Sequence, residues 1–223
     1  HGWIVVAPDH TGNTFLDDSG SIEEIAQRRP QDLADAVDWL LSENEAGGSY
    51  EGCVDANDGY AVVGHSFGGY TTYAAAGADV DWNGELTDLS DPRVWAGVAW
   101  APWDVNGAIV EGAATITVPM ATLGGTLDDT LTWASQRDLH NALTVAPRVL
   151  GEFPTAGHYS FSPVACTLAG LKGDGCGDEF IDLDLFVDLV DTATLSFLAR
   201  AHGDAAALEQ LPDSTDVIWT VVE

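Results

Sequence analysis

Basic residues are scarce in this sequence, and their scarcity excludes a class of partner. Seven Lys and Arg stand against 36 Asp and Glu, which gives a formal net charge of −29, and Lys172 is the single lysine. A field of that sign repels nucleic acid and anionic membrane surfaces, so we expect no nucleic-acid partner. The carboxylate excess is typical of a solvated acidic surface, as in salt-adapted or acid-tolerant secreted proteins.

The sequence also lacks a long apolar run. Its longest runs, residues 3–7 and 61–63, are far shorter than the roughly 20 residues that a helix needs to cross a bilayer, so we expect no membrane span. Metal-binding patterns are missing as well, because the acidic segment 55–59 lacks the Glu that closes an EF-hand calcium loop. We therefore expect the protein to act without a metal ion or cofactor.

Cysteine is limited to three residues. Cys166 and Cys176 lie in a Gly-rich stretch, without the CxxC spacing or neighbouring His of a zinc site. Their spacing suits a disulfide that braces a loop at about 162–180, with a stabilisation of roughly 2.5–3 kcal/mol in the chain-entropy model. A disulfide indicates a secreted or periplasmic protein. Cys53 is then left over.

The distribution of apolar residues predicts the fold class. Short apolar runs alternate with amphipathic segments, which indicates one α/β domain over residues 1–223, with a mostly parallel central sheet flanked by helices. Strands are predicted at 3–7, 60–63, 94–100, 117–123 and 148–153. Helices are predicted from Pro30 to the Gly47-Gly48 stop, from the end of the second strand through 76, at 134–143, and at 182–201 before Gly203.

A nucleophile motif lies between the second strand and the helix that follows it. Gly64-His-Ser-Phe-Gly68 fits the pattern G-x-S-x-G. At a strand-to-helix junction this pattern is typical of a sharp turn, for which glycine is needed because side chains would collide. The turn lifts the hydroxyl of Ser66 above the sheet and directs the backbone N–H of Phe67 at a developing oxyanion.

A serine hydroxyl needs a base, and His158 is the predicted one. It follows the 148–153 strand in a loop, where its imidazole would reach over the strand ends. The other histidines precede the motif, lie in or at the end of a helix, or, like His65, are directed away from Ser66 by the turn. The acid that orients the imidazole is expected between Ser66 and His158 in the chain. Asp128 is favoured over its neighbour Asp129 and over Asp104.

Together these segments resemble the bacterial dienelactone-hydrolase-like group of the α/β-hydrolase superfamily, related to platelet-activating-factor acetylhydrolases and bacterial cutinases. The matching pieces are His1-Gly-Trp-Ile-Val-Val-Ala-Pro-Asp-His10, Arg29-Pro30 with Asp32, Gly64-His-Ser-Phe-Gly-Gly69, Gly124-Gly-Thr-Leu-Asp128 and Ala156-Gly-His-Tyr-Ser-Phe161. The acetylhydrolases place their acid where this sequence has Ala101. Cutinase-like polyester hydrolases use a G-x-x-L-D-type loop that is similar to the one ending at Asp128.

The resemblance also bears on substrate contacts. The cutinase-like enzymes carry a Pro-Trp at a strand end, as in Pro102-Trp103, whose ring helps to wall the acyl site. Trp103 is thus a candidate substrate contact, with a core tryptophan as the alternative. His65, beside the nucleophile, is a second candidate.

The predicted function is that of a serine carboxylic ester hydrolase with a Ser66–His158–Asp128 triad, in its sharper form a cutinase-like polyester hydrolase. The alternatives are a lipase or acetylhydrolase acting on small soluble or phospholipid esters, a peptidase or acyltransferase on the same fold, and a binding domain with a relic triad. An ester substrate is the expected partner.

The resemblance further implies early strands that are missing from this chain. We expect a preceding segment of the same gene product to pack beside the strand at 3–7 and to carry the second oxyanion donor. Cys53 could bond to a cysteine of that segment. Without such a segment, the second donor would come from the loop after Asp9.

Overall fold

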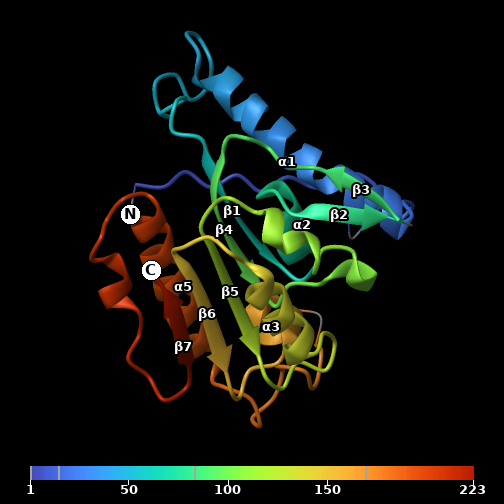
Figure 1. The fold of residues 1–223 in the computed structure, drawn as a ribbon, viewed down its shortest axis with the longest axis vertical. Coiled ribbons are helices and arrows are strands. Elements are labelled where there is room, and N and C mark those ends of the chain that lie inside the picture. The colour runs from blue at the N-terminus through green and yellow to red at the C-terminus, as the bar shows by residue number, and fades with distance from the viewer. Residues whose placement is uncertain (1, 15, 83, 169) are drawn as a thin grey trace.

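The computed structural model describes residues 2–14, 16–82, 84–168 and 170–223, and its core is an α/β sandwich. In these residues, five helices and four short 3₁₀ turns are interspersed with seven strands, arranged as in Figure 1. The helices are α1 (Ile22–Asn44), α2 (Phe67–Ala75), α3 (Trp133–Ala142), α4 (Pro163–Thr167) and α5 (Leu183–Ala201). The strands are β1 (Tyr60–His65), β2 (Asp79–Trp82), β3 (Glu85–Asp88), β4 (Val94–Trp100), β5 (Met120–Gly125), β6 (Arg148–Phe153) and β7 (Ile218–Val222).

The central sheet has the strand order β1-β4-β5-β6-β7. The first four strands are parallel, and β7 pairs antiparallel with β6. The carboxyl ends of the four parallel strands therefore meet at one edge, toward which β5 and β6 run at the bottom of Figure 1. The sequence prediction of a mostly parallel sheet flanked by helices is confirmed, and β7 was not anticipated.

Helices cover both faces of this sheet. Helices α1, α2 and α3 pack in one apolar cluster with Val94 and Ala99 of β4. The side chains between them, Ala96 and Val98, point to the other face and pack with Phe197 of α5. A strand that is buried on both faces reads as a continuous apolar run, which is why β4 was predicted with its observed bounds.

The first helix begins earlier than the sequence prediction placed it. Pro30 lies inside α1 and not at its start. The helix begins after Ser21, whose hydroxyl accepts from the Glu24 N–H while the Glu24 carboxylate accepts from the Ser21 N–H. This reciprocal capping box outweighs the proline signal, because Pro30 removes one helical hydrogen bond whereas the cap satisfies two backbone N–H groups.

The strand predicted at 3–7 is wrong. The segment is irregular, and Val5 is 86% exposed. A strand requires a hydrogen-bonded neighbour, and in the described residues β1 pairs with β4 alone, at the edge of the sheet. The ring of Trp3 lies instead 5.9 Å from that of Trp95 and 5.8 Å from that of His202.

Strands β2 and β3 pair antiparallel as a small two-stranded sheet that the periodicity did not indicate. It lies beside α1 in Figure 1 and away from the strand ends that carry the motifs. Strand β5 also begins three residues later than predicted, with Met120, opposite Gly97 of β4, as the first paired residue.

The expected disulfide is present. Cys166 of α4 is bonded to Cys176, and the turn before Cys176 is closed by two hydrogen bonds between the backbones of Gly173 and Cys176. Cys53 is a free, exposed thiol. No helix in the described part of the chain has the length and apolar character that crossing a membrane requires.

The cysteine pairing predicts a simple labelling pattern. Alkylation of the denatured, unreduced protein should add one label, on Cys53, and alkylation after reduction should add three. Intact-mass measurement before and after reduction reads both numbers. Three labels without reductant would contradict the Cys166–Cys176 bond.

Candidate functional site

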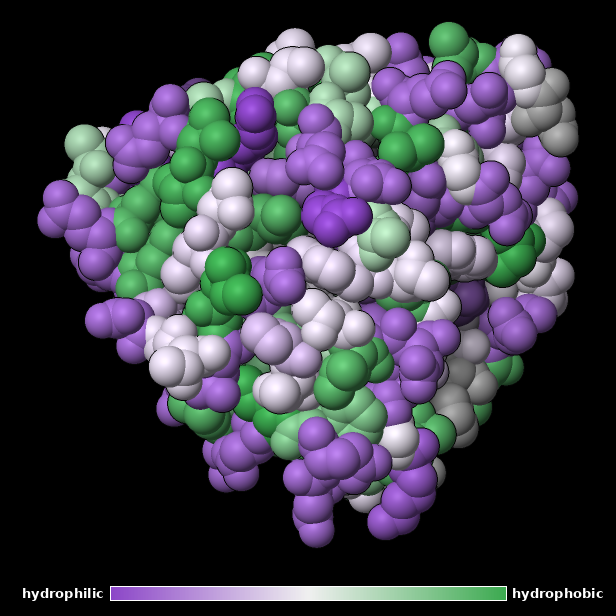
Figure 2. Space-filling view, turned by 60° about the horizontal axis from the view of Figure 1, so that its bottom comes forward, coloured by the Kyte–Doolittle hydropathy of each residue, from purple (hydrophilic) through white to green (hydrophobic). Residues whose placement is uncertain are grey.

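Four loops at the carboxyl edge of the parallel strands bring the predicted residues together. Ser66 follows β1, Trp103 follows β4, Asp128 follows β5 and His158 follows β6. Figure 2 turns the bottom of Figure 1 forward and shows apolar and hydrophilic side chains interspersed over that face. Open α/β sheets carry their sites at this edge, because loops from successive parallel strands meet there.

Ser66 occupies a strained backbone position between β1 and α2. Its φ of 59° and ψ of −115° lie outside the regions that ordinary side chains favour. The Ser66 N–H donates to the Trp100 carbonyl and the Trp103 N–H donates to the Ser66 carbonyl, at 2.9 and 3.0 Å. These two backbone hydrogen bonds hold the turn in place and keep the Ser66 hydroxyl at the end of β1.

Glycines allow the backbones to approach closely at this turn, but the two that are needed differ from the predicted pair, Gly64 and Gly68. A Cβ on Gly64 would lie 2.2 Å from the Gly68 carbonyl oxygen, and one on Gly69 would lie 2.6 Å from the Cα of Pro102. A Cβ on Gly68 would meet nothing closer than an Arg29 nitrogen at 3.9 Å. The packing therefore requires Gly64 and Gly69, and the second of these lies outside the five-residue motif.

Ser66, His158 and Asp128 form a hydrogen-bonded chain. The Ser66 Oγ and His158 Nε2 are 2.9 Å apart, and the His158 Nδ1 and Asp128 Oδ2 are also 2.9 Å apart. The His158 and Asp128 side chains are 3% and 0% exposed. Because a carboxylate accepts at Nδ1, the neutral imidazole carries its proton there and leaves Nε2 to accept the serine proton. Chemically, this arrangement can deprotonate the hydroxyl.

Asp128 is held by two further donors. Its Oδ1 accepts from the Leu131 N–H at 2.6 Å, and its Oδ2 accepts from Gln136 Nε2 at 2.8 Å. Gln136 comes from the first turn of α3 and is fully buried. Its amide oxygen lies where a Cβ on Gly124 would be 2.1 Å away, so glycine at that position makes room for it.

The two alternative acids lie elsewhere. Asp129 is exposed, and its backbone N–H donates to Asp174. Asp104 accepts from the Ile109 N–H at 2.8 Å, and burial raises the pKa of its carboxyl. Of the three candidates, Asp128 is the one that bonds to His158.

The His65 ring lies beside the His158 ring at a tilt of 43°, with the ring centroids 4.6 Å apart. Its Nε2–H donates to the His158 carbonyl oxygen at 3.1 Å. Burial, followed by the nearby His158, lowers the pKa of His65 to about 3, so the ring is neutral at physiological pH. The structure therefore places His65 as a support for the His158 loop, and its predicted contact with substrate remains a prediction.

The Phe67 ring, directly after Ser66 in the chain, lies against Trp103 and Arg29. The Trp103 ring is half-buried and packs edge-on against Phe67 with 5.2 Å between centroids. The Arg29 guanidinium lies over the Phe67 ring, 4.6 Å from its centroid. The Phe67 N–H opens α2, where the first-turn N–H groups have no acceptor within the helix and can point at an anion. Phe67 and Trp103 both pack against the apolar cluster beneath α2, and the predicted roles of the Phe67 N–H at an oxyanion and of Trp103 at the substrate remain predictions.

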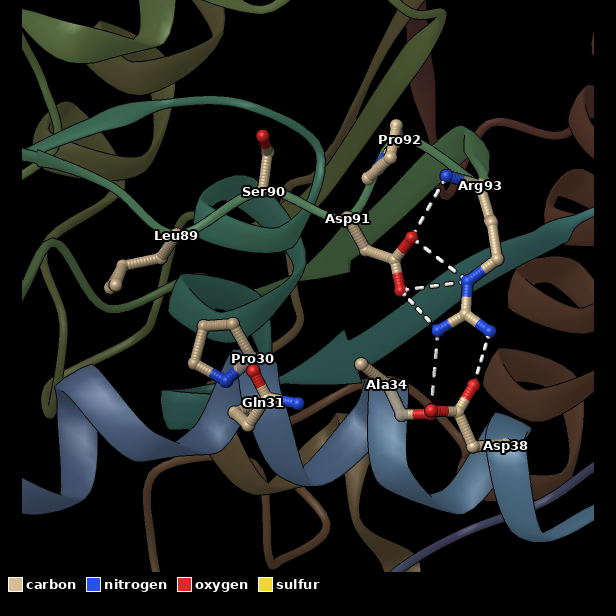
Figure 3. A pocket seen from close by; sticks show the side chains of 9 residues that line it. All are labelled: Pro30, Gln31, Ala34, Asp38, Leu89, Ser90, Asp91, Pro92 and Arg93. Carbon is tan, nitrogen blue, oxygen red and sulfur yellow. Dashed lines mark hydrogen bonds and ion pairs between the residues drawn. The ribbon is translucent and has the colours of Figure 1, made fainter.

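The hollow in Figure 3 is separate from this site. It lies between α1 and the segment before β4, and its charged groups satisfy one another: Arg93 bonds to Asp91 and Asp38. A second hollow is lined by Trp3, His202 and residues of α5. In the described residues, no group of three or more His, Cys, Asp or Glu is placed to hold a metal ion.

Comparison with known proteins adds no name to this geometry. No family model matches the chain, and no curated protein matches it.

Two residues of the site were missed by sequence reasoning. Gln136, which bonds to Asp128, carries no signal, because a glutamine in a helix is ordinarily a surface residue. Asp174 accepts hydrogen bonds from the Asp129 and His158 backbone. The placement of Asp174 between two glycines in the cysteine loop signalled a turn but not a contact with the site.

The glycine geometry predicts opposite effects of one substitution at neighbouring positions. Gly69→Ala should destabilise the protein by about 1–3 kcal/mol, because its methyl group would overlap the Pro102 backbone. Gly68→Ala is the matched control and should be neutral or stabilising by up to about 1 kcal/mol, since alanine favours the helix and the space is open. Urea unfolding of both variants measures the difference. Equal effects would contradict the packing at Gly69.

Buried histidine predicts a loss of stability in acid. Burial, with the charge of Arg148 as a lesser cause, lowers the pKa of His140 to about 4. Between that value and the ordinary histidine pKa near 6.5, the unfolded chain binds a proton that the folded chain does not, so stability falls as pH falls. His140→Gln should reduce this slope by up to about 1.4 kcal/mol per pH unit.

Chemical unfolding across pH 4 to 8 tests this. Above pH 7 the wild-type and His140→Gln curves should run parallel, because the imidazole is then neutral in both states. Parallel curves below pH 6 as well would show that His140 titrates normally in the folded protein.

Proposed function

We propose that the protein is a serine carboxylic ester hydrolase of the α/β-hydrolase type, acting through an acyl-enzyme. The observation that carries the proposal is the continuous chain from the Ser66 hydroxyl through both nitrogens of His158 to Asp128, with 2.9 Å at each step. A nucleophile, a base and an orienting acid in mutual hydrogen-bond reach constitute the machinery of acyl transfer.

In the first half-reaction, Ser66 Oγ attacks the ester carbonyl while His158 Nε2 takes its proton. The carbonyl oxygen becomes an oxyanion, which the Phe67 N–H stabilises at the start of α2. His158 then gives the proton to the departing alcohol oxygen, and the acyl group stays on Ser66. Water, deprotonated by the same imidazole, attacks the acyl-enzyme and releases the acid together with free Ser66.

Asp128 keeps the imidazole in the productive tautomer. Its carboxylate accepts the Nδ1 proton, so Nε2 is free to accept from serine, and it stabilises the imidazolium that forms during attack. The Leu131 N–H donates to Oδ1 of that carboxylate, and the Gln136 amide donates to Oδ2, the oxygen that also bonds to His158. This support favours one orientation of the acid throughout the cycle.

The strain at Ser66 favours catalysis over a binding role. Ser66, with φ of 59° and ψ of −115°, occupies a sparsely populated backbone region that costs about 1–3 kcal/mol, and strain of this kind clusters at active sites. A binding module has no need to lift one hydroxyl in this way.

In its sharper form the proposal is cutinase-like hydrolysis of polyesters. The half-buried Trp103 ring beside Phe67 supports an apolar acyl site, in line with the resemblance of the Pro102-Trp103 pair. The disulfide supports a secreted or periplasmic location.

Substitution of any member of the hydrogen-bonded chain Ser66–His158–Asp128 should abolish turnover. Ser66→Ala and His158→Ala should each lower kcat on a p-nitrophenyl ester by about 10³-fold or more, because the members act as a unit. Asp128→Asn should cost a similar factor by stabilising the wrong tautomer. Asp104→Asn and Asp129→Asn are the controls and should stay near wild type.

A fluorophosphonate probe tests the proposal without a substrate. It should label the wild type on Ser66, and not the Ser66→Ala variant. A panel of p-nitrophenyl esters from acetate to long chain, run beside polyester film, then separates small esters from polymer. Full activity in Asp128→Asn, with loss in either control, would show that the acid is another residue.

A further inference from the structure

The carboxylate of Asp174 joins the two loops that carry the acid and the base. Its Oδ1 accepts from the His158 N–H at 2.8 Å and from the Asp129 N–H at 2.9 Å. Its Oδ2 accepts from the Thr130 hydroxyl at 2.6 Å. One side chain thus bonds to His158 itself and to the two residues that follow Asp128.

The loop that carries Asp174 is itself fixed. The disulfide between Cys166 and Cys176 closes it, and the Gly173–Cys176 turn holds Asp174 at its tip with φ of 48°. The Asp174 carbonyl also accepts from the Tyr159 N–H at 2.8 Å. Both the backbone and the side chain of Asp174 therefore bond to the His158 segment.

Two glycines let this loop lie directly on the His158 segment. A Cβ on Gly157 would lie 2.4 Å from the Asp174 carbonyl carbon, and one on Gly175 would lie 2.4 Å from the Ser160 nitrogen. Such close approach between backbones excludes larger residues at either position. The contact is therefore built into the loop and does not depend on a flexible side chain.

We propose that Asp174 is a positioning residue that sets the separation of His158 and Asp128, and that the Cys166–Cys176 disulfide acts on catalysis through it. The inference rests on the proposed function. The His158–Asp128 bond spans two loops from different strands, β5 and β6, and its 2.9 Å length depends on how those loops sit relative to each other. Asp174 fixes that relation by accepting from both loops at once.

The charge of Asp174 suits this role. Burial raises the pKa of its carboxyl, but the hydrogen bonds from Thr130, His158 and Asp129 outweigh burial and hold the pKa below its usual value. The group is therefore an anion at neutral pH, and hydrogen bonds to an ionised acceptor are shorter and stronger than neutral ones. The anion is close to the His158 backbone and makes no hydrogen bond to the ring.

Asp174→Ala should lower kcat by about 10-fold to 100-fold, since small displacements of catalytic groups cost that much, while KM should change less than about 2-fold. Asp174→Asn should recover most of the loss, because its amide oxygen can still accept from both N–H groups. Asp178→Ala removes the same charge from an exposed position two residues beyond Cys176, and it should match wild type.

Removal of the disulfide by substitution tests whether it acts through Asp174. The variant with Cys166 and Cys176 both replaced by Ser should lose a similar fraction of kcat as Asp174→Ala. The same serine pair in the Asp174→Ala background should cause little further loss, because the link is already broken. Multiplicative losses would overturn the claim that the disulfide acts through Asp174.

A proton NMR signal separates the two proposals. The His158 Nδ1–H that donates to Asp128 should give a downfield resonance in wild type, which Asp174→Ala broadens or shifts and Asp178→Ala leaves unchanged. If wild type shows this signal but neither turnover nor fluorophosphonate labelling, the proposed function fails and the signal alone decides the positioning role. If wild type is active and Asp174→Ala has wild-type kcat and signal, the positioning role is wrong.

Folding of the variants is checked by circular dichroism. Should Asp174→Ala fail to fold, Thr130→Val replaces it, since it removes the hydrogen bond to Asp174 Oδ2 and leaves the loop backbone intact. Thr130→Val should then lower kcat several-fold without changing KM, and wild-type kcat in this variant would overturn the proposal.

Discussion

Backbone packed against backbone at the turn around Ser66 is the constraint on which the site depends. Gly64 lies against Gly68, and Gly69 lies against Pro102, with no room for a Cβ at either Gly64 or Gly69. This packing brings α2 directly onto the end of β1 and leaves Ser66 no ordinary backbone conformation. The proposed acyl transfer requires the hydroxyl and the first N–H groups of α2 to face the same side of this turn.

The loops that carry Asp128 and His158 are bonded to one another as well as connected to the sheet. Asp128 and His158 come from neighbouring strands, but a shared strand edge does not by itself set a hydrogen bond between two loops. Gln136 anchors Asp128 from α3, His65 supports His158 from β1, and Asp174 joins the two loops from the disulfide-bonded segment. Each support reaches the site from a different element, so the geometry belongs to the fold as a whole.

The strongly acidic composition bears on the role of Asp174. With a net charge of −29, like charges repel across the surface. Asp174 carries one of those charges, yet it lies among three hydrogen-bond donors, which stabilise it where most of the other carboxylates are solvated. The disulfide holds this anion against two loops, which packing alone would not achieve because the large apolar side chains of the segment, Val164, Leu168 and Leu171, are exposed.

The sequence by itself determined the elements whose signals are local. Continuous apolar runs identified β1, β4 and β6, the Gly-rich motif located Ser66, and chain order with strand-end position selected His158 and Asp128, which the structure brings together. Only the tertiary structure decided the rest. The run at 3–7 is no strand because pairing needs a neighbour, and β7 and the β2–β3 pair exist because a partner is present. Gln136 and Asp174 act across gaps of 8 and 16 residues from the groups they hold, and no local pattern encodes such contacts.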